Sequence, residues 1–439
     1  MPKSLLPPVR DFNNLPKRPV RDTDTELHVA ESRSTFASLC LVSKSFLHLA
    51  RKRLYYRPFA ISKKDTPQRM EKLVSSLQTN SILGSLVRIL VPPSSTHSSL
   101  RLLLLNLCPQ LIAFSLNSSN GELTIPQLRI ALKPLVGVRK LSLVCPSSSF
   151  FDWRSFALEI LAFPAFAALR ELYVRTGEVN HESSGSTRLP LPLKSLVIDS
   201  SFETFRAIEP LLPDNMATLT SLTLSEVRFT SEELQGLLES LGSTIAFLSL
   251  GAHSRRLVIF AETYRNDYDV LPGILSHHFT RFRNLVSLAL PHTQGPSLAL
   301  LRVLVSSCRH LVELDFSGSL WTSDQPLSSA LTAEQHFDLV FPQEAIISAL
   351  QSLSKLKTLN LGYLMYSDEE IKGVNLRNAL EGGGFEEVEW DVVFSDDPED
   401  DDESDESDDS VSDSEESGAD SENDTEAPHG EEEEAEASA

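Results

Sequence analysis

One apolar pattern recurs along most of the chain and limits its fold more than any other feature. An apolar residue is followed, three and five positions later, by two more. The triplet occurs at Leu86/Ile89/Val91, Leu111/Phe114/Leu116, Val138/Leu141/Leu143, Leu169/Leu172/Val174, Leu193/Leu196/Ile198, Leu219/Leu222/Leu224, Ile245/Leu248/Leu250, Leu285/Leu288/Leu290, Leu311/Leu314/Phe316, Leu356/Leu359/Leu361 and Phe385/Val388/Trp390. Most triplets start 24 to 31 residues after the previous one, and two intervals of 40 and 45 residues indicate insertions. This period predicts a repeat architecture rather than one globular core.

The spacing inside the triplet predicts a short strand in each repeat. The second and third apolar residues are two positions apart, so on a strand both point into the core while the residue between them points out. A strand of this length cannot bury its apolar side alone, but parallel stacking of successive repeats makes a continuous core. We therefore expect an α/β solenoid, with parallel strands on the concave face and helices on the convex face.

Helix start signals lie between the triplets, where the solenoid needs helices. Thr66-Pro67 is typical of an N-cap and first helical residue, and Met70, Leu73 and Leu77 follow on one helical face. The spacing of a capping box, in which a Ser or Thr is followed three positions later by Glu or Gln, occurs at Thr230/Glu233, Thr332/Gln335 and Ser367/Glu370.

The charge of the chain is concentrated at its C-terminal end. The formal net charge is −22, yet residues 395–439 hold 23 Asp and Glu and no Lys or Arg, so the remainder is close to neutral. We predict that this acidic tail is disordered, because it lacks the apolar residues that would offset the entropy of ordering it. A neutral body and an acidic tail argue against nucleic acid as a partner, and the tail suits basic proteins better.

Cysteine usage and hydropathy indicate where the protein works. The four cysteines, Cys40, Cys108, Cys145 and Cys308, form no CxxC pair and have apolar neighbours, which favours buried thiols in a reducing compartment. We expect no secretion signal and no membrane span, since no apolar run reaches the length that a bilayer requires. The expected location is the cytoplasm, the nucleus or both.

The N-terminal part of the chain divides into two segments. Residues 1–29 are rich in Pro and charge and are predicted to be disordered. In residues 30–60, Phe36, Leu39, Val42, Phe46 and Leu49 recur at helical spacing, and Ser43 is a candidate N-cap, so two short helices meeting at Ser43 are expected. The predicted domains are thus 1–29, 30–60, a repeat domain over 61–394, and the tail over 395–439.

Two of these segments resemble a known family. The repeats resemble leucine-rich repeats, and Cys108-Pro-Gln-Leu111 and Cys308-Arg-His-Leu311 are similar to the cysteine-containing subtype common in F-box proteins, where the cysteine ends a helix and fills a core gap. The stretch Leu41-Val-Ser-Lys-Ser-Phe46, followed by Leu54-Tyr55-Tyr56, resembles the second half of an F-box. The opening half, which normally carries a Leu-Pro motif on a helix, is not recognisable upstream of Ser34.

The resemblance implies a partner and the residues that bind it. An F-box docks an Skp-type adaptor and so links the repeats to a cullin ubiquitin ligase, and here Leu41, Val42, Lys44 and Phe46 would bind the adaptor. An alternative reading is that the segment only caps the first repeat, because the ends of a solenoid need covering. For the docking reading we expect Phe46 and Leu49 to face inward and Leu41, Val42 and Lys44 to stay accessible.

Signatures of chemistry are absent from the sequence, which has no GxSxG elbow, Walker loop or HExxH. Gly382-Gly-Gly384 is followed by Phe-Glu-Glu rather than Lys-Ser/Thr, which favours a turn over a phosphate site. His277-His278 lacks a Cys or carboxylate at ligand spacing, so we expect a pair in a surface loop. We expect no enzyme activity, no cofactor and no metal. The Arg51-Lys52-Arg53 run is read as a solvated helix face that could steer an adaptor.

Recognition of a partner is expected on the outward side of the strands. The residues between the inward apolar positions are Leu90, Ser115, Ser142, Tyr173, Val197, Thr223, Ser249, Ala289, Asp315 and Asn360, flanked by Lys140, Glu171, Arg175, Asp199, Phe247 and Glu313. Aromatic residues on an exposed sheet face favour an interface, and we select Tyr173, Arg175, Asp199, Phe247, Glu313 and Asp315 as candidate client-binding residues. Lys140 with Glu171, and Arg175 with Asp199, could instead be ordinary ion pairs between neighbouring strands.

Two functions follow from these features. In the first, the protein is the substrate-recognition adaptor of an Skp–cullin–F-box ubiquitin ligase and marks its client for degradation. In the second, it is an adaptor-independent repeat scaffold whose acidic tail binds basic proteins.

Overall fold

The computed structural model describes residues 38, 44–58, 67–92, 96–117, 123–145, 153–176, 188–200, 204–227, 229–251, 277–290, 297–317, 319, 343–366, 385 and 387–394. The chain divides into two units at residue 395, and the second, residues 396–439, lies outside the described residues. The predictions for the tail, for residues 1–29 and for the capping boxes at Thr332 and Ser367 also fall outside them.

The strands of the described residues form a single parallel sheet of eleven, in chain order from β1 to β11. Their bounds are β1 Ile89–Leu90, β2 Ala113–Asn117, β3 Lys140–Val144, β4 Glu171–Arg175, β5 Ser195–Asp199, β6 Ser221–Ser225, β7 Phe247–Gly251, β8 Ser287–Ala289, β9 Glu313–Asp315, β10 Thr358–Tyr366 and β11 Glu387–Phe394. Each strand coincides with one predicted triplet, so the all-parallel, leucine-rich-repeat-like sheet is confirmed.

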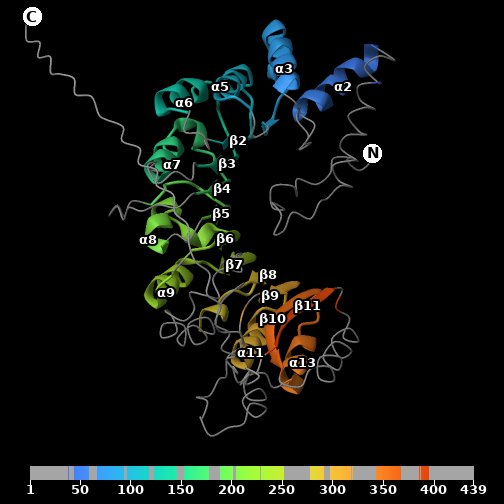
Figure 1. The fold of residues 1–439 in the computed structure, drawn as a ribbon, viewed down its shortest axis with the longest axis vertical. Coiled ribbons are helices and arrows are strands. Elements are labelled where there is room, and N and C mark those ends of the chain that lie inside the picture. Colours follow the sequence, from blue (N-terminus) through green and yellow to red (C-terminus); the bar gives the residue numbers. More distant parts are fainter. Residues whose placement is uncertain are drawn as a thin grey trace, which may run out of the picture. The chain divides into compact units, whose positions relative to one another are not determined.

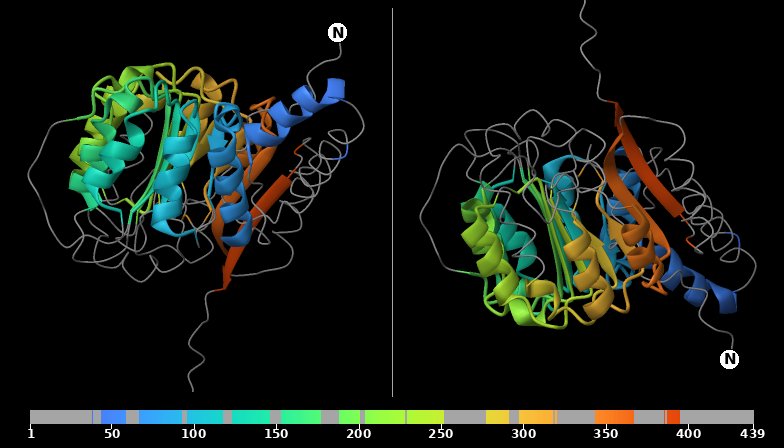
Figure 2. Two further views of the ribbon diagram at one scale, coloured as in Figure 1. Left: turned by 90° about the horizontal axis from the view of Figure 1, so that it is seen from above. Right: turned by 90° about the horizontal axis from the view of Figure 1, so that it is seen from below.

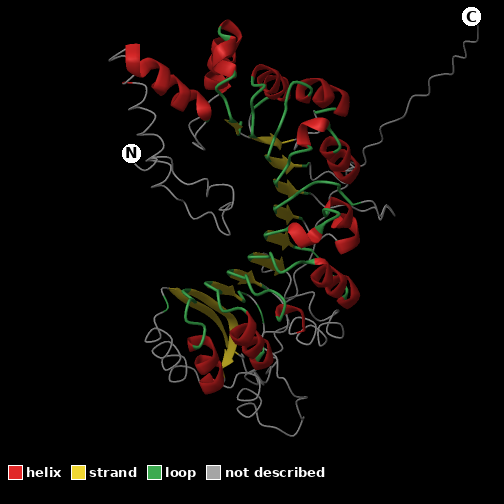
Figure 3. Ribbon diagram, turned by 180° about the vertical axis from the view of Figure 1, so that it is seen from behind, coloured by secondary structure: helices red, strands yellow, loops and turns green. Residues whose placement is uncertain are grey.

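Helices lie along one side of the sheet, and those from α5 onward connect its strands. They are α2 Lys44–Tyr56, α3 Pro67–Thr79, α4 Ser81–Gly84, α5 Ser98–Leu107, α6 Ile125–Leu132, α7 Trp153–Leu161, α8 Phe205–Ile208, α9 Ser231–Ser240, α11 Leu298–Ser307 and α13 Gln343–Gln351, with 3₁₀ turns η2 Pro164–Phe166, η3 Glu209–Leu211 and η4 Met216–Thr218. Figure 1 shows α5 to α9 beside β2 to β7, and Figure 2 shows the two layers end-on. In Figure 3 the strands follow an arc with the helices along its outer side, as predicted.

The apolar triplets build the core between the two layers. From β2 to β10 the second residue of each triplet is buried, for example Phe114, Leu172 and Leu314. One backbone pattern repeats at the start of each strand: the carbonyl of Arg139 accepts hydrogen bonds from the N–H groups of Arg170 and Glu171, at 2.8 and 2.9 Å. This ladder fixes the register, so equivalent residues of successive repeats lie side by side.

The first repeat departs from the predicted register by one residue. Leu90 was expected to point outward, but it is buried and pairs with Phe114, an inward residue. Val87 is buried in the same way, whereas Leu86 and Val91 are only half-buried. The prediction was wrong because every residue from Leu86 to Val91 except Arg88 is apolar, so the alternation does not distinguish the two registers.

Helix ends and cysteines largely follow the expectations. α3 starts at Pro67, and Thr230 caps α9, with its N–H donating to Glu233 Oε2 at 2.9 Å. Cys108 and Cys308 are buried at the C-caps of α5 and α11, and Cys145 is buried as well. Burial raises the pKa of each of these three thiols to about 12, which favours packing over reactivity.

The expectation that His277 and His278 form a pair in a surface loop was wrong for His278. Its side chain is 3% exposed, while His277 is exposed. Within the described part of the chain, no three His, Cys, Asp or Glu side chains are grouped to hold a metal ion. Among the same residues, no helix has the length and apolar character that crossing a membrane requires.

Candidate functional site: the sheet face and the N-terminal helix

The sheet face brings three of the predicted client-binding residues together at the ends of β4 and β5. The Tyr173 hydroxyl donates to Asp199 Oδ2 at 3.1 Å, and Arg175 Nε lies 3.6 Å from the same oxygen. Tyr173 and Asp199 are diagonal neighbours, because Tyr173 is in register with Val197 and Asp199 lies two residues further along β5. We call Tyr173, Arg175 and Asp199 the β4–β5 cluster.

The electrostatics of this cluster are set by burial and by Asp199. Burial, together with the neighbouring Asp199 carboxylate, raises the pKa of the Tyr173 hydroxyl, so Tyr173 stays a neutral hydrogen-bond donor. Because Asp199 is shared between Tyr173 and Arg175, both side chains are held in one arrangement. The Arg175 side chain remains 64% exposed and can still meet a partner.

Sequence reasoning missed Glu226, which stands beside the cluster immediately after β6. Its φ of 57° lies in the left-handed region, which non-glycine residues seldom occupy. The Glu226 N–H donates to the Gly251 carbonyl at 2.7 Å, and the Ser200 hydroxyl donates to the Glu226 carbonyl at 3.3 Å, so both flanking repeats hold this conformation. Burial and then the Asp199 charge raise the pKa of Glu226. A side chain in a left-handed turn leaves no pattern that marks it in the sequence.

Phe247 lies on the same face, three strands beyond Tyr173. Phe247 is the first residue of β7 and is 46% exposed. It is in register with Ser221 of β6 and Ser287 of β8. Ser287 and Ala289 are only 5% and 1% exposed, so the expectation that Ala289 belongs to an exposed row was wrong. Larger side chains on the neighbouring strands shield small ones from solvent, and Ser287 lies in register between Phe247 and Glu313.

The remaining predicted client-binding residues, Glu313 and Asp315, are half-buried on β9. Asp315 Oδ1 accepts a hydrogen bond from the Ser317 N–H at 2.9 Å, so it also shapes the turn that follows its strand. The structure therefore places these two residues on the same face as Phe247 but does not join them to the β4–β5 cluster. Lys140 and Glu171 form the expected ion pair, with Nζ and Oε2 2.6 Å apart.

The helix α2 carries the described part of the F-box-like segment. It starts at Lys44, directly after the expected N-cap Ser43, and ends at Tyr56. Leu41 and Val42 lie outside the described residues, and the side chains of Lys44 and Phe46 do as well. Arg51, Lys52 and Arg53 are exposed, as expected for a solvated face.

The two sides of α2 differ. Ala50 is 3% exposed and Tyr55 packs against the core, whereas Leu49 is 61% exposed. The expectation that Leu49 faces inward was wrong, because Ala50, one helical position later, takes the inward direction. The Arg88 N–H donates to the Tyr56 carbonyl at 3.0 Å, which repeats at the edge of the sheet the bond that other repeats form with each other.

Comparison with known proteins adds little to this description. No family model matches the chain, and no curated protein matches it significantly. Among solved structures, a chain from "Crystal structure of Rad7 and Elc1 complex in yeast" is similar, with 15% sequence identity and a TM-score of 0.27 over 71% of this chain and 95% of that chain. A TM-score this low carries no argument about function.

Proposed function

We propose that this protein is a substrate-recognition adaptor of an Skp–cullin–F-box ubiquitin ligase. In this proposal the N-terminal helical segment docks an Skp-type adaptor, and the sheet face binds a client protein. The protein itself performs no chemistry and needs no cofactor or metal; the ligase does the chemistry, in the cytoplasm, the nucleus or both.

The observation that carries the proposal is the placement of Leu49. A large apolar side chain that is 61% exposed, on a helix whose opposite side is packed, supports a surface reserved for a partner. Arg51, Lys52 and Arg53 border this position and could speed the approach of an acidic adaptor surface. The F-box-like sequence of residues 41–46 lies immediately before it.

The sheet face supports the second half of the proposal. The β4–β5 cluster offers a prearranged cation, Arg175, and Phe247 offers an exposed aromatic ring, the residue types that often anchor protein interfaces. Preorganisation favours binding because fewer side chains must be ordered when the client arrives.

The alternative function is an adaptor-independent repeat scaffold. The bond between Arg88 and Tyr56, together with the burial of Ala50, favours it, because both would be required of a helix that only covers the end of the core. In this case the acidic tail would bind basic proteins.

Co-purification of the full chain with a recombinant Skp-type adaptor separates the two functions. Leu49→Asp should abolish the adaptor's retention, whereas Ile130→Asp, at a 70% exposed position on α6, should leave it unchanged. Failure of the unaltered chain to retain the adaptor, or full retention by Leu49→Asp, would favour the scaffold.

The client-binding half has its own test. Proteins that co-purify with the full chain should be lost from the Tyr173→Ala and Phe247→Ala variants but kept by Ile130→Ala. A client lost equally from all three variants would not be held by the sheet face.

A further inference from the structure

Three bases, one from each of three successive repeats, stand in a column at the start of β3, β4 and β5. Arg139, Arg170 and Lys194 precede these strands at equivalent positions, and all three side chains are exposed. The Arg170 N–H donates to the Arg139 carbonyl at 2.8 Å, and the Lys194 N–H donates to the Arg170 carbonyl at 2.7 Å. They are therefore about 4.8 Å apart per strand. We call these three residues the basic edge.

The positive charge of the basic edge is not neutralised within the described part of the chain. Arg170 donates to the Pro192 carbonyl and Lys194 Nζ to the Thr218 carbonyl, both at 3.2 Å, and these acceptors are uncharged. A guanidinium has five N–H groups and an ammonium three, so most donors remain available. Among the described residues no carboxylate lies within ion-pair distance of Arg139, Arg170 or Lys194.

Other bases of the same repeats are paired. Lys140 lies 2.6 Å from Glu171, Arg129 lies 3.2 Å from Glu159, and Arg188 lies 2.9 Å from Glu209. The carboxylates of these pairs lie on β4, α7 and η3, so carboxylates are common in this part of the fold. The basic edge is thus a distinct positive surface beside neutralised ones.

The fold does not require a base at these positions. The equivalent residues are Ile112 before β2, Ala246 before β7, Val286 before β8 and Val312 before β9, and their backbone groups form the same ladder. Single bases stand at the same place before β1 (Arg88) and β10 (Lys357), but neither has a base in the adjoining repeat. Thr220 takes the place before β6, and the connection leading to it carries Asp214, so the positive column ends at β5. Because structure alone does not explain three consecutive bases here, a binding role is favoured.

An exposed apolar side chain adjoins the column. Val136 is 83% exposed and stands three residues before Arg139. Gly137, with a φ of 80°, turns the chain between Val136 and the buried Val138. The surface therefore offers an apolar contact at one end and three cations in a row.

We infer that the basic edge, with Val136, binds an acidic segment of another protein that also carries an apolar residue. Charge complementarity identifies the partner as anionic. A protein segment fits better than single-stranded nucleic acid, because nucleic-acid grooves of this kind combine cations with aromatic stacking platforms. Here the exposed neighbour is Val136, and only three cations stand in the row. This surface is separate from the sheet face and the α2 surface of the proposed function.

Fluorescence anisotropy with a fluorescein-labelled peptide of repeated Glu-Glu-Leu units tests the inference on the full chain. The unaltered protein should bind it saturably, and more weakly at high salt. The variant R139Q/R170Q/K194Q should bind about tenfold more weakly, because each exposed charge contact that is lost weakens binding about twofold. The control R283Q/R302Q/R309Q removes three exposed arginines elsewhere and should bind as the unaltered protein does.

A second variant keeps the test decisive if loss of the carbonyl contacts of Arg170 and Lys194 unfolds the triple variant. Val136→Asp adds a negative charge at a position that makes no buried contact, and it should also weaken peptide binding several-fold. Three results would overturn the inference: no saturable binding by the unaltered chain, an equal loss in the control variant, or tighter binding of a single-stranded oligonucleotide of the same length.

Discussion

The Arg88 N–H donates to the carbonyl oxygen of Tyr56 at 3.0 Å, and this bond ties the last residue of α2 to the residue that precedes the first strand of the sheet. From β2 onward, the equivalent N–H is bonded to the preceding repeat, so Tyr56 takes the place of a missing repeat. The same helix therefore serves as the end of the solenoid and, in the proposed function, as part of a docking surface.

The first prediction separates these two roles by stability. Ala50→Asp should lower the free energy of unfolding by about 2–4 kcal/mol, because it places a charge at a buried position. Leu49→Asp should change it by less than about 1 kcal/mol, since Leu49 is exposed. Urea denaturation measures both, and equal losses in the two variants would contradict the two-sided description of α2.

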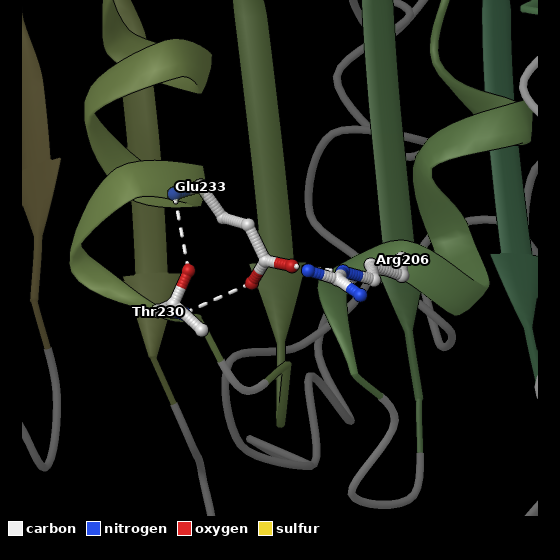
Figure 4. Close-up of polar contacts among 3 residues, drawn as sticks. All are labelled: Arg206, Thr230 and Glu233. Carbon is white, nitrogen blue, oxygen red and sulfur yellow. Dashed lines mark hydrogen bonds and ion pairs between the residues drawn. The ribbon is translucent and has the colours of Figure 1, made fainter.

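The second prediction concerns Glu233, whose carboxylate serves two repeats at once (Figure 4). Oε2 accepts from the Thr230 N–H at 2.9 Å, and Oε1 accepts from Arg206 Nε of α8 at 3.1 Å. Glu233→Ala should cost about 1 kcal/mol, because the Thr230 N–H loses its capping-box partner. Arg206→Ala should cost less than about 0.5 kcal/mol, because the Arg206 side chain is 80% exposed and its ion pair is screened by water. Thermal unfolding measures both losses of stability. A larger loss in Arg206→Ala than in Glu233→Ala would contradict the prediction and show that the ion pair dominates.

The third prediction concerns the left-handed residue Glu226. Glu226→Gly should stabilise the fold by about 1 kcal/mol at neutral pH, because glycine adopts a positive φ without steric cost. Glu226→Gln keeps the strain but removes the charge. Since the pKa of Glu226 is raised in the fold, stability falls as the pH rises from its ordinary value of 4.5 through the folded-state value. The Gln variant should lack this loss, which urea midpoints well below 4.5 and at neutral pH would show.

The fourth prediction is a pH dependence that arises from His278. Burial, then the His277 charge, lowers the pKa of His278 below its ordinary value of 6.5, so the folded chain favours the neutral ring. The unfolded chain then binds more protons, and the stability that is present above 6.5 is lost as the pH falls below it. His278→Gln should flatten the dependence of the urea midpoint in this window. If the urea midpoint of His278→Gln depends on pH as strongly as that of the unaltered chain, other groups cause the pH dependence.

The fifth prediction concerns the thiols of Cys108, Cys145 and Cys308. Iodoacetamide should leave them unmodified in the folded protein at mildly alkaline pH, since burial raises their pKa to about 12 and the thiolate is the reactive form. In urea all three should react. Mass spectrometry of digested protein gives the modification of each cysteine, and rapid labelling of Cys308 without urea would contradict its burial.

The strands could be located from the sequence because the spacing of apolar residues within a strand depends only on residues close together in the chain. Leu222 and Leu224 are two residues apart, and only a strand puts both into the core. The rule failed at Leu90, where both alternating sets of positions are apolar. It also failed at Leu49, since a helical face predicted from spacing alone cannot tell which of two adjacent apolar positions meets the core.

The candidate site was predictable to the extent that it depends on register. Arg175 and Asp199 occupy matching positions of neighbouring strands, so their ion pair follows from the alignment of the repeats. The contact of Tyr173 with Asp199 is diagonal and depends on side-chain rotamers. The basic edge lies outside the strands, in the connections that lead to them, where no apolar pattern marks the positions.

The direct pairing of β7 with β8 shows where this fold can accommodate additional sequence. Phe247 is in register with Ser287 although the connection between Gly251 and Ser287 is longer than every other connection of the sheet except the one between β9 and β10. Closing a flexible loop of twice the length costs only about 0.6 kcal/mol more, so the stacked repeats tolerate growth at this junction. Evolution can therefore add recognition elements here without rebuilding the scaffold, and a fluorescent or affinity module could be grafted at the same place.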